Sequence, residues 1–423
     1  MSTKTIRIDS PLKKAALIIA AVACIVGAFF FAKWGLVNSA VLRADNAELA
    51  IYLTTLAPDD PLPHYSAAVH LEKSFAPDDV DHAIKELEIA AGRAPENYLY
   101  WLDLGRARER NGDSEGAEAA LRRSLSLAPN YSRVQWALGN ALLRQGRREE
   151  AFAEMTKAVS GDPAFAMPAA VTAWQFYNGD IDQIRRSIGR SSRLDGALAT
   201  LLLGQKKYDE AIVMWDNIPA EDKSTTLKDT GSAIFAKLLE VKKLREALRI
   251  SYDLDNQATR IEPGTIANGG FESPVKLQGA GPFEWQIAAG LQPQIVLSSG
   301  KKHGGSNSLL LVFSTNDAKD FRGIGLLVPV EPNTDYELEV FYSSDLKTSA
   351  VFKWEVVDAA DAHSIALTDA IGNRADWTAL KVRFKSSESD GIVIRLVRGD
   401  CGPVCPVAGN LWFDDISLRR VTQ

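Results

Sequence analysis

Three patterns of hydrophobic and polar residues follow one another along the 423-residue chain. The first is an uncharged run from Ala15 to Ala32, rich in Ala, Ile, Val and Phe. A helix rises 1.5 Å per residue, so roughly 20 apolar residues cross a bilayer core about 30 Å thick. Lys33 and Trp34 suit the membrane interface. The pattern predicts a transmembrane helix over residues 15–37.

The charges before this run predict its orientation. Basic residues collect on the cytoplasmic side of membrane helices, and four of them precede the run: Lys4, Arg7, Lys13 and Lys14. We therefore expect a cytoplasmic tail over residues 1–14. The chain would pass once through a bacterial-type inner membrane, with its bulk periplasmic or otherwise extracytoplasmic. Two alternatives stay open: a signal peptide cleaved after the poor site Asn38-Ser39-Ala40, and a buried helix.

The second pattern is helical and covers residues 45–255, with Asp45 as the expected N-cap of a first helix ending at Leu56. Small and helix-breaking residues recur within it after 34 residues: Leu104-Gly105 and Leu138-Gly139, Gly112 and Gly146, Ala117 and Ala151, Pro129 and Pro163. This period is typical of stacked helix–turn–helix units. Small residues let two helices cross closely, glycine permits positive φ in the turn, and proline stops the second helix.

These positions resemble the tetratricopeptide repeat. One copy carries Trp101, Leu104, Gly105, Ala117 and Pro129, and the next carries Leu138, Gly139, Ala151, Ala158 and Pro163. A weaker copy precedes them, and Ala211 and Ala247 mark two degenerate ones. The resemblance implies a helical solenoid whose groove binds a protein partner. The groove candidates are Tyr98, Asp103, Arg106, Arg133, Asn140 and Arg144. The alternative is a spacer, or a packing surface for the C-terminal domain.

The third pattern begins near Ile261, where short alternating segments replace the helical period. Alternation with a period of two marks a strand with one buried side. Eight strands are expected, over residues 294–298, 308–313, 324–330, 335–342, 350–357, 378–385, 391–397 and 411–418. They predict a jelly-roll β-sandwich over residues 265–423, after a linker over 256–264. The expected fold class is thus a transmembrane helix, an all-α solenoid and an all-β sandwich.

Five short motifs, in order, resemble a carbohydrate-binding module of the galactose-binding-like family 4/9 type. They are Asn268-Gly269-Gly270-Phe271-Glu272, Trp285, Gly305-Ser306-Asn307-Ser308-Leu309, the segment 328–336, and Phe413-Asp414-Asp415-Ile416-Ser417-Leu418. The resemblance implies that the first and last strands lie together and hold a structural calcium ion. Its candidate ligands are Glu272, Asp414 and Asp415, since carboxylate oxygens suit Ca²⁺. Otherwise these carboxylates are solvated surface groups.

A sugar-binding site uses an aromatic platform with polar groups beside it. The candidates are Trp285, Trp354, Trp377, Arg395 and Trp412. Most tryptophans of a sandwich belong to its core, which is the alternative for each. Cys401 and Cys405 bracket a short loop and are expected to form a disulfide outside the cytoplasm. They would stay a reduced pair if the predicted topology is wrong.

Composition excludes several other functions. The net charge of −6 argues against a nucleic-acid partner. Three cysteines and five histidines without metal-ligand spacing make a zinc site improbable. Motifs of serine hydrolases, P-loop enzymes, zinc proteases and dinucleotide enzymes are absent from the sequence.

The sequence therefore predicts a non-catalytic envelope scaffold, with repeats that bind a protein and a sandwich that binds glycan in polysaccharide export or assembly. The first alternative is an assembly factor whose sandwich is a structural or protein-contact module. The second is a glycan-modifying enzyme.

Overall fold

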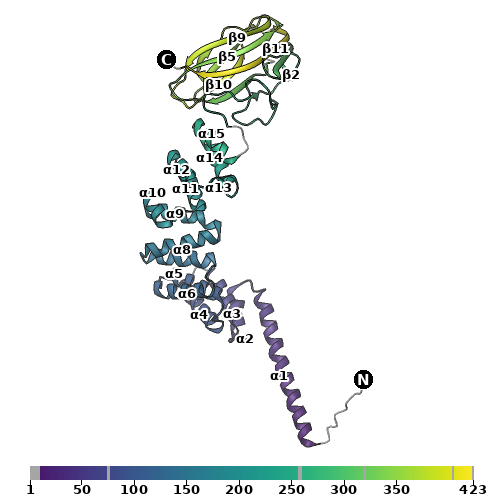
Figure 1. Ribbon diagram of the computed structural model, residues 1–423. Coiled ribbons are helices and arrows are strands. Elements are labelled where there is room, and N and C mark those ends of the chain that lie inside the picture. Colours follow the sequence, from purple (N-terminus) through teal and green to yellow (C-terminus); the bar gives the residue numbers. More distant parts are fainter. Residues whose placement is uncertain (1–9, 74–76, 256–259, 318–320, 403, 422–423) are drawn as a thin grey trace. The chain divides into compact units, whose positions relative to one another are not determined.

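The computed structural model describes residues 10–73, 77–255, 260–317, 321–402 and 404–421. Lys4, Arg7 and part of the predicted linker lie outside these ranges. Contacts divide the chain into two compact units, Met1–Leu198 and Ala199–Gln423, which are described separately. One long apolar helix comes first, further helices follow, and antiparallel sheets complete the chain (Figure 1). This order confirms the predicted fold class.

The first helix, α1 (Pro11–Val41), is long and apolar enough to cross a membrane. Ser10 caps its start by accepting a hydrogen bond from the backbone N–H of Lys13 at 3.3 Å. The side chains of its apolar stretch are exposed, whereas Val37 and Val41 are buried. The predicted span of 15–37 lies within α1. Asn38-Ser39-Ala40 continues the same helix, so this weak cleavage sequence is not in a loop.

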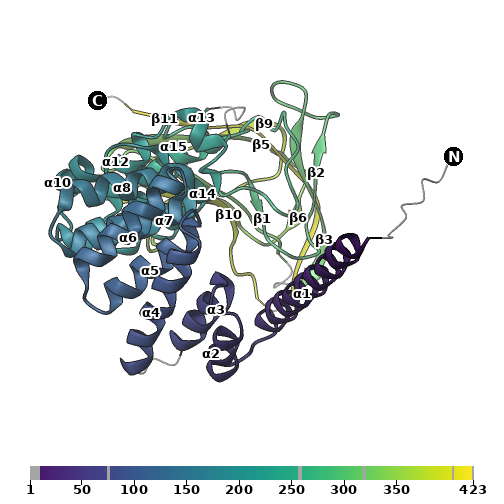
Figure 2. The ribbon, with the colours of Figure 1, turned by 90° about the horizontal axis from the view of Figure 1, so that it is seen from below.

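Successive helices of the first unit pack as hairpins in chain order, as both ribbon views show (Figure 1, Figure 2). A short 3₁₀ turn (Pro163–Phe165) precedes α9, and α11 crosses into the second unit. The helices are α2 (Ala47–Leu56), α3 (Pro61–Leu71), α4 (Pro77–Arg93), α5 (Tyr98–Arg110), α6 (Ser114–Leu127), α7 (Ser132–Arg144), α8 (Arg148–Gly161), α9 (Ala166–Phe176), α10 (Ile181–Ile188) and α11 (Ser192–Gly204).

The repeat residues act as their positions predicted. A Cβ atom on Gly105 would lie 2.6 Å from Cγ of Leu121 and 3.1 Å from the carbonyl oxygen of Ala117. A Cβ on Gly139 would lie 3.0 Å from the carbonyl oxygen of Ala151. Both helix pairs therefore cross where only glycine fits. The turn residues Gly112 and Gly146 have φ of 84° and 80°, in the region that favours glycine.

One local prediction needs correction. The N-cap of α2 is Asn46 rather than Asp45, because the side-chain oxygen of Asn46 accepts the backbone N–H of Leu49 at 2.8 Å. Pro61 begins the next helix. It occupies the first turn of α3, where its missing N–H costs nothing, and Asp60 caps that helix by accepting the N–H of Leu62 at 3.1 Å.

The second unit opens with helices that surround Trp215, which is fully buried. Its indole N–H donates to Asp253 at 2.8 Å, and a Cβ on Gly231 would lie 2.5 Å from its ring. This tryptophan and glycine thus hold the degenerate repeats together. The helices are α12 (Tyr208–Asp216), α13 (Ala220–Ser224), α14 (Lys228–Glu240) and α15 (Leu244–Leu254).

The sandwich consists of two antiparallel sheets that enclose one apolar core. In order across each sheet, the five-stranded sheet contains β1 (Gln286–Ile287), β4 (Ile324–Pro329), β10 (Gly391–Arg398), β7 (Phe352–Asp358) and β8 (Ser364–Leu367). The second contains β2 (Gln294–Ser298), β3 (Ser308–Asp317), β11 (Val404–Arg420), β5 (Asp335–Ser344) and β9 (Arg374–Lys385), with β6 (Lys347–Thr348) beside β11.

All eight predicted strands are present, with ends shifted by a few residues. The sequence analysis missed β1, β6 and β8, each of two to four residues. Such short segments contain too few positions for alternation to be recognised.

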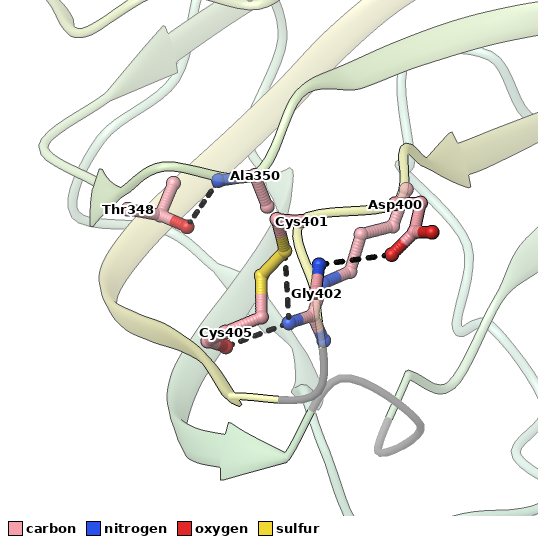
Figure 3. Close-up of a disulfide and its surroundings, with 7 residues drawn as sticks. Thr348, Ala350, Asp400, Cys401, Gly402 and Cys405 are labelled. Carbon is pink, nitrogen blue, oxygen red and sulfur yellow. Dashed lines mark hydrogen bonds between the residues drawn. A yellow bond between two sulfur atoms is a disulfide. The ribbon is translucent and has the colours of Figure 1, made fainter.

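The predicted disulfide joins Cys401 and Cys405 in the loop between β10 and β11 (Figure 3). Their Cα atoms are 5.6 Å apart, a usual separation for a disulfide. The guanidinium of Arg398 donates to the carbonyl oxygen of Cys405 at 2.7 Å. Asp400 accepts the backbone N–H of Gly402 at 2.9 Å. These bonds hold the loop beside the end of β10.

We expect Gly139→Ala to destabilise the helical repeats by about 1–3 kcal/mol, because the new methyl group overlaps the α7–α8 contact. Gly92→Ala is the matched control, since nothing lies within 4 Å of its Cβ position in α4. That change should be neutral or stabilising, because alanine favours helices. Thermal unfolding of both variants, followed by helical circular dichroism, tests the crossing. Equal melting temperatures would contradict it.

We also expect only one thiol to react when the native protein is alkylated without reductant, namely the free thiol of Cys24. After denaturation and reduction, all three cysteines of the chain should react. Mass spectrometry of protein purified from membranes counts the adducts. Three adducts before reduction would show that the Cys401–Cys405 bond is absent and would remove its support for an oxidising compartment.

Candidate functional site

Aromatic side chains gather on the outer face of the second sheet. Trp412 pairs across the strands with Leu310 and Ser343, and Phe341 pairs with Ala379. Trp412 and Phe341 alternate along their strands with core residues, so their side chains point away from the core. His303, from the loop before β3, stacks on Phe341 at 3.9 Å between ring centroids and meets Trp377 edge-on at 5.8 Å. We call Phe341, Trp377, Trp412 and His303 the outer aromatic face.

Lys301 adds a positive charge to the outer aromatic face. Its ammonium group lies 4.5 Å from the centroid of the Trp412 ring, a cation–π distance. It also donates to the carbonyl oxygen of Ala375 at 2.8 Å. The three ring-bearing strand residues are half-buried and His303 is exposed. The face therefore offers flat rings and hydrogen-bond donors to solvent at the same place.

The remaining sugar-site candidates lie elsewhere. Trp285 and Trp354 are core residues, 2% and 0% exposed, and they pack edge-on at 6.0 Å. Neither ring can contact a glycan in this fold. Arg395 lies on the outer face of the opposite sheet and forms an ion pair with Glu355 at 2.7 Å. The structure thus brings Trp377 and Trp412 to one face and separates the other three candidates from them.

The calcium candidates lie near the bulge of β11, beside the segment 268–272. The backbone N–H of Ile416 donates to the carbonyl oxygen of Gly269 at 2.9 Å, so the first and last segments of the sandwich are neighbours. A Cβ on Gly270 would lie 3.5 Å from a carboxylate oxygen of Asp415 and 4.0 Å from one of Asp414. Glycine at this position leaves space next to both carboxylates.

Backbone amides of the loop 303–307 hold these carboxylates. Asp414 accepts the N–H groups of His303 and Gly304 at 2.7 and 3.1 Å. Glu272 accepts those of Ser306 and Asn307 at 2.8 and 3.2 Å. Burial raises the pKa of Asp414, although the backbone hydrogen bonds oppose this shift. The imidazole Nδ1 of His303 lies 2.6 Å from Asp415.

One other group has metal-ligand character. Among the described residues, only Asp358, Asp361 and His363 place three ligand atoms within 4.8 Å of one another. Glu272, Asp414 and Asp415 therefore do not converge this closely here. Asp361 and His363 are exposed and pair with each other at 2.6 Å, while Asp358 is buried. Their proximity is explained by the turn after β7.

Three of the six groove candidates take part in a polar network along the first helices of the repeats. Asp103 accepts the Tyr65 hydroxyl at 2.8 Å and lies 3.8 Å from Arg106. Arg144 pairs with Glu109 at 3.1 Å, linking α7 to α5. Arg110 pairs with Glu72, linking α5 to α3.

The other groove candidates lie on the same two helices. Tyr98 meets Tyr131 edge-on at 5.1 Å, Asn140 donates to the carbonyl oxygen of Trp136 at 3.0 Å, and Arg133 is exposed. All six candidates thus belong to α5 and α7.

Partial burial changes the acidity of this network. It raises the pKa of Glu72 and of Glu109, while the arginines Arg110 and Arg144 oppose the shift. Burial, together with the hydrogen bond to Asp103, also raises the pKa of Tyr65. Glu72, Glu109 and Tyr65 were not among the sequence candidates. Glu72 and Glu109 face the first helix of the following repeat. This position in the repeat was the sequence signal that could have identified them.

Arginines also line a cleft between α8 and α10. Its walls include Arg147, Arg148, Tyr177, Gln183, Arg186 and Ser187. Arg147 is bound by Glu118 and Glu150, each at 2.6 Å, and Arg148 lies 5.0 Å from the Phe176 ring. These partners neutralise or cover much of the charge, which is typical of a solvated helix face.

A comparison with protein-family models supports the repeat class that the sequence predicts for the helical part. A tetratricopeptide-repeat family model matches residues 78–132 and 102–164, which confirms that resemblance for the regular repeats. A comparison with curated proteins finds no match to this chain.

Solved structures similar to parts of the chain fall into two groups. A MamA RS-1 double mutant is 16% identical, covering 44% of this chain and 92% of its own, with a TM-score of 0.30. A carbohydrate-binding module of family 4 is 14% identical, covering 37% and 99%, with a TM-score of 0.28. A family 61 module solved with β-1,4-galactotriose is 15% identical, covering 38% and 100%, with a TM-score of 0.28.

Proposed function

We propose that this protein is a non-catalytic, membrane-anchored scaffold of the cell envelope. Its repeats bind a protein partner, and its sandwich binds a glycan during polysaccharide export or assembly. The helix α1 anchors it, with the bulk of the chain outside the cytoplasm. The match to the tetratricopeptide-repeat model supports the protein-binding part. The disulfide between Cys401 and Cys405 supports an oxidising compartment.

The outer aromatic face is the observation that carries the glycan part. Aromatic rings stack on the apolar face of a pyranose, and neighbouring donors bond its hydroxyl groups. Trp377 and Phe341 supply rings at the edge of the second sheet, and Lys301 supplies a donor. On the opposite sheet, the outward positions next to Arg395 are Val393 and Val397, which give no platform. The outer face of the second sheet therefore offers the aromatic rings that a sugar needs, whereas the positions beside Arg395 on the opposite sheet do not.

We expect Trp377→Ala to weaken polysaccharide binding about tenfold, which corresponds to about 1.4 kcal/mol for one lost stacking contact. Arg395→Ala is the control, because it changes the opposite face and should leave affinity unchanged. Affinity electrophoresis of the full chain against neutral and acidic soluble polysaccharides measures both. Loss of binding in Arg395→Ala alone would place the site on the other sheet. The absence of binding to every polysaccharide would refute the glycan function.

We further propose that Glu272, Asp414 and Asp415 hold a structural calcium ion. Their hard oxygen ligands and the glycines beside them fit such an ion. Bound calcium would fix the loop 303–307 to the bulge of β11. The carboxylates bind only when ionised, and burial raises the pKa of Asp414. Calcium binding should therefore be stronger at pH 7 than at pH 5.

Calcium should raise the melting temperature of the sandwich, because a ligand that binds only the folded state stabilises it by about 2.7 kcal/mol at 100 times its Kd. Glu272→Gln should abolish the shift. Glu284→Gln, which removes an exposed carboxylate paired with Lys276, should retain it. Calorimetry of the full chain with calcium or chelator makes the comparison at both pH values. An unchanged shift in Glu272→Gln would reject these ligands.

One observation favours a second function, in which the sandwich is a structural or protein-contact module. Two rings of the outer aromatic face already have partners, because His303 covers Phe341 and Lys301 covers Trp412. Beside them, Glu337 and Glu339 form ion pairs with Lys381, Arg383 and Arg419. A charged surface of this kind suits a protein partner. Failure of every polysaccharide to bind would favour this function.

A further inference from the structure

The helix α2 runs back along α1 instead of continuing away from it. Leu53, in the middle of α2, packs with Val37 and Val41 near the end of α1. The following turn, Leu56 to Pro61, lines a cleft with Phe30, Lys33 and Trp34 of α1. Both ribbon views show α2 beside the end of α1 (Figure 1, Figure 2). The chain thus runs back along α1, past several of its residues, before α3 begins.

The depth of this turn follows from helix geometry. The apolar run of α1 extends to Ala32, and Phe30 lies about 10 Å below Val37 at 1.5 Å rise per residue. Protein covers Val37, but Phe30 and Trp34 are 61% and 58% exposed. A turn that shares a cleft with Phe30 and Trp34 is therefore at the level where the hydrocarbon core meets the head groups.

The surface of α2 fits the same environment. It is an apolar helix with one charged residue, Glu48, and it exposes Leu49 and Tyr52, the latter by 58%. Aromatic residues with a polar tip favour the membrane interface. Lys33, Asp59 and Asp60 line the same cleft, so charged groups lie at the level expected for lipid head groups. Asn38 donates to Asp60 at 3.1 Å and ties the turn to α1.

We propose that α2 and the turn Leu56–Pro61 form a membrane-contacting foot, and that phospholipids of the outward-facing leaflet occupy the cleft between this foot and α1. This proposal rests on the proposed membrane anchor. The foot fixes the first hairpin of the repeats against the bilayer surface, because α3 starts directly from it at Pro61. The anchor then acts as a rigid mount rather than a flexible tether.

Spin labels in the full chain, reconstituted into phospholipid nanodiscs, test the foot. One label is placed on the native thiol Cys24, in the middle of α1. The second is on Asp59→Cys in a Cys24→Ser background, because Asp59 is exposed. The third, on Asn130→Cys in the same background, is the matched control in the exposed turn between α6 and α7. The collision rate of each label with oxygen measures its exposure to lipid. The collision rate with a water-soluble nickel chelate measures its exposure to water.

We expect Cys24 to be reached by oxygen and shielded from nickel. The label at residue 59 should show several-fold lower nickel accessibility than the label at 130, with higher oxygen accessibility. Equal values at 59 and 130, with Cys24 in lipid, would overturn the foot and leave the anchor intact. Shielding of residue 59 from both reagents would show that protein covers the turn, which also overturns the proposal. A water-exposed Cys24 would overturn the anchor and the foot together.

Discussion

The close crossing of the two helices in each regular repeat is the constraint on which the helical part depends. At Gly105 and Gly139 a single methyl group would overlap the neighbouring helix. The short distance lets Leu121 and Met155 fill the seam, and it fixes the angle at which the next hairpin begins. A repeat cannot bury its apolar side alone, so this geometry passes from hairpin to hairpin. It also places the first helices side by side, where Glu72, Glu109 and their arginines connect them.

Features with a local or periodic signal could be predicted from the sequence. The 34-residue period located the regular repeats, and positive φ at Gly112 and Gly146 followed from their place in the turn. Strand alternation located all eight longer strands of the sandwich, including the strand 350–357 that corresponds to β7. The cap of α2 was wrong by one residue, because Asp45 and Asn46 are both good caps and only tertiary packing chooses between them.

The candidate sites depend on contacts between distant segments, which a single sequence does not specify. Trp377 is outward because Thr378 and Ala379 pair with Tyr342 and Phe341 in a particular register. His303 joins the outer aromatic face from a loop that no period describes. The return of α2 along α1 likewise arises from packing of Leu53 against Val37 and Val41. The sequence named Trp377 and Trp412 but not Phe341, Lys301 or His303, whereas the family resemblance did place Glu272 near Asp414 and Asp415.

His303 belongs to both of these sites. Its backbone and imidazole contact Asp414 and Asp415, while its ring covers Phe341. An ion that draws Asp415 away from His303 also changes how tightly that ring is held over the aromatic surface. Two ligands that act on one shared residue are thermodynamically coupled, and each alters the affinity of the other by the same factor. Under the proposed function, the affinity of the outer aromatic face for a glycan would therefore depend on the concentration of the proposed ion.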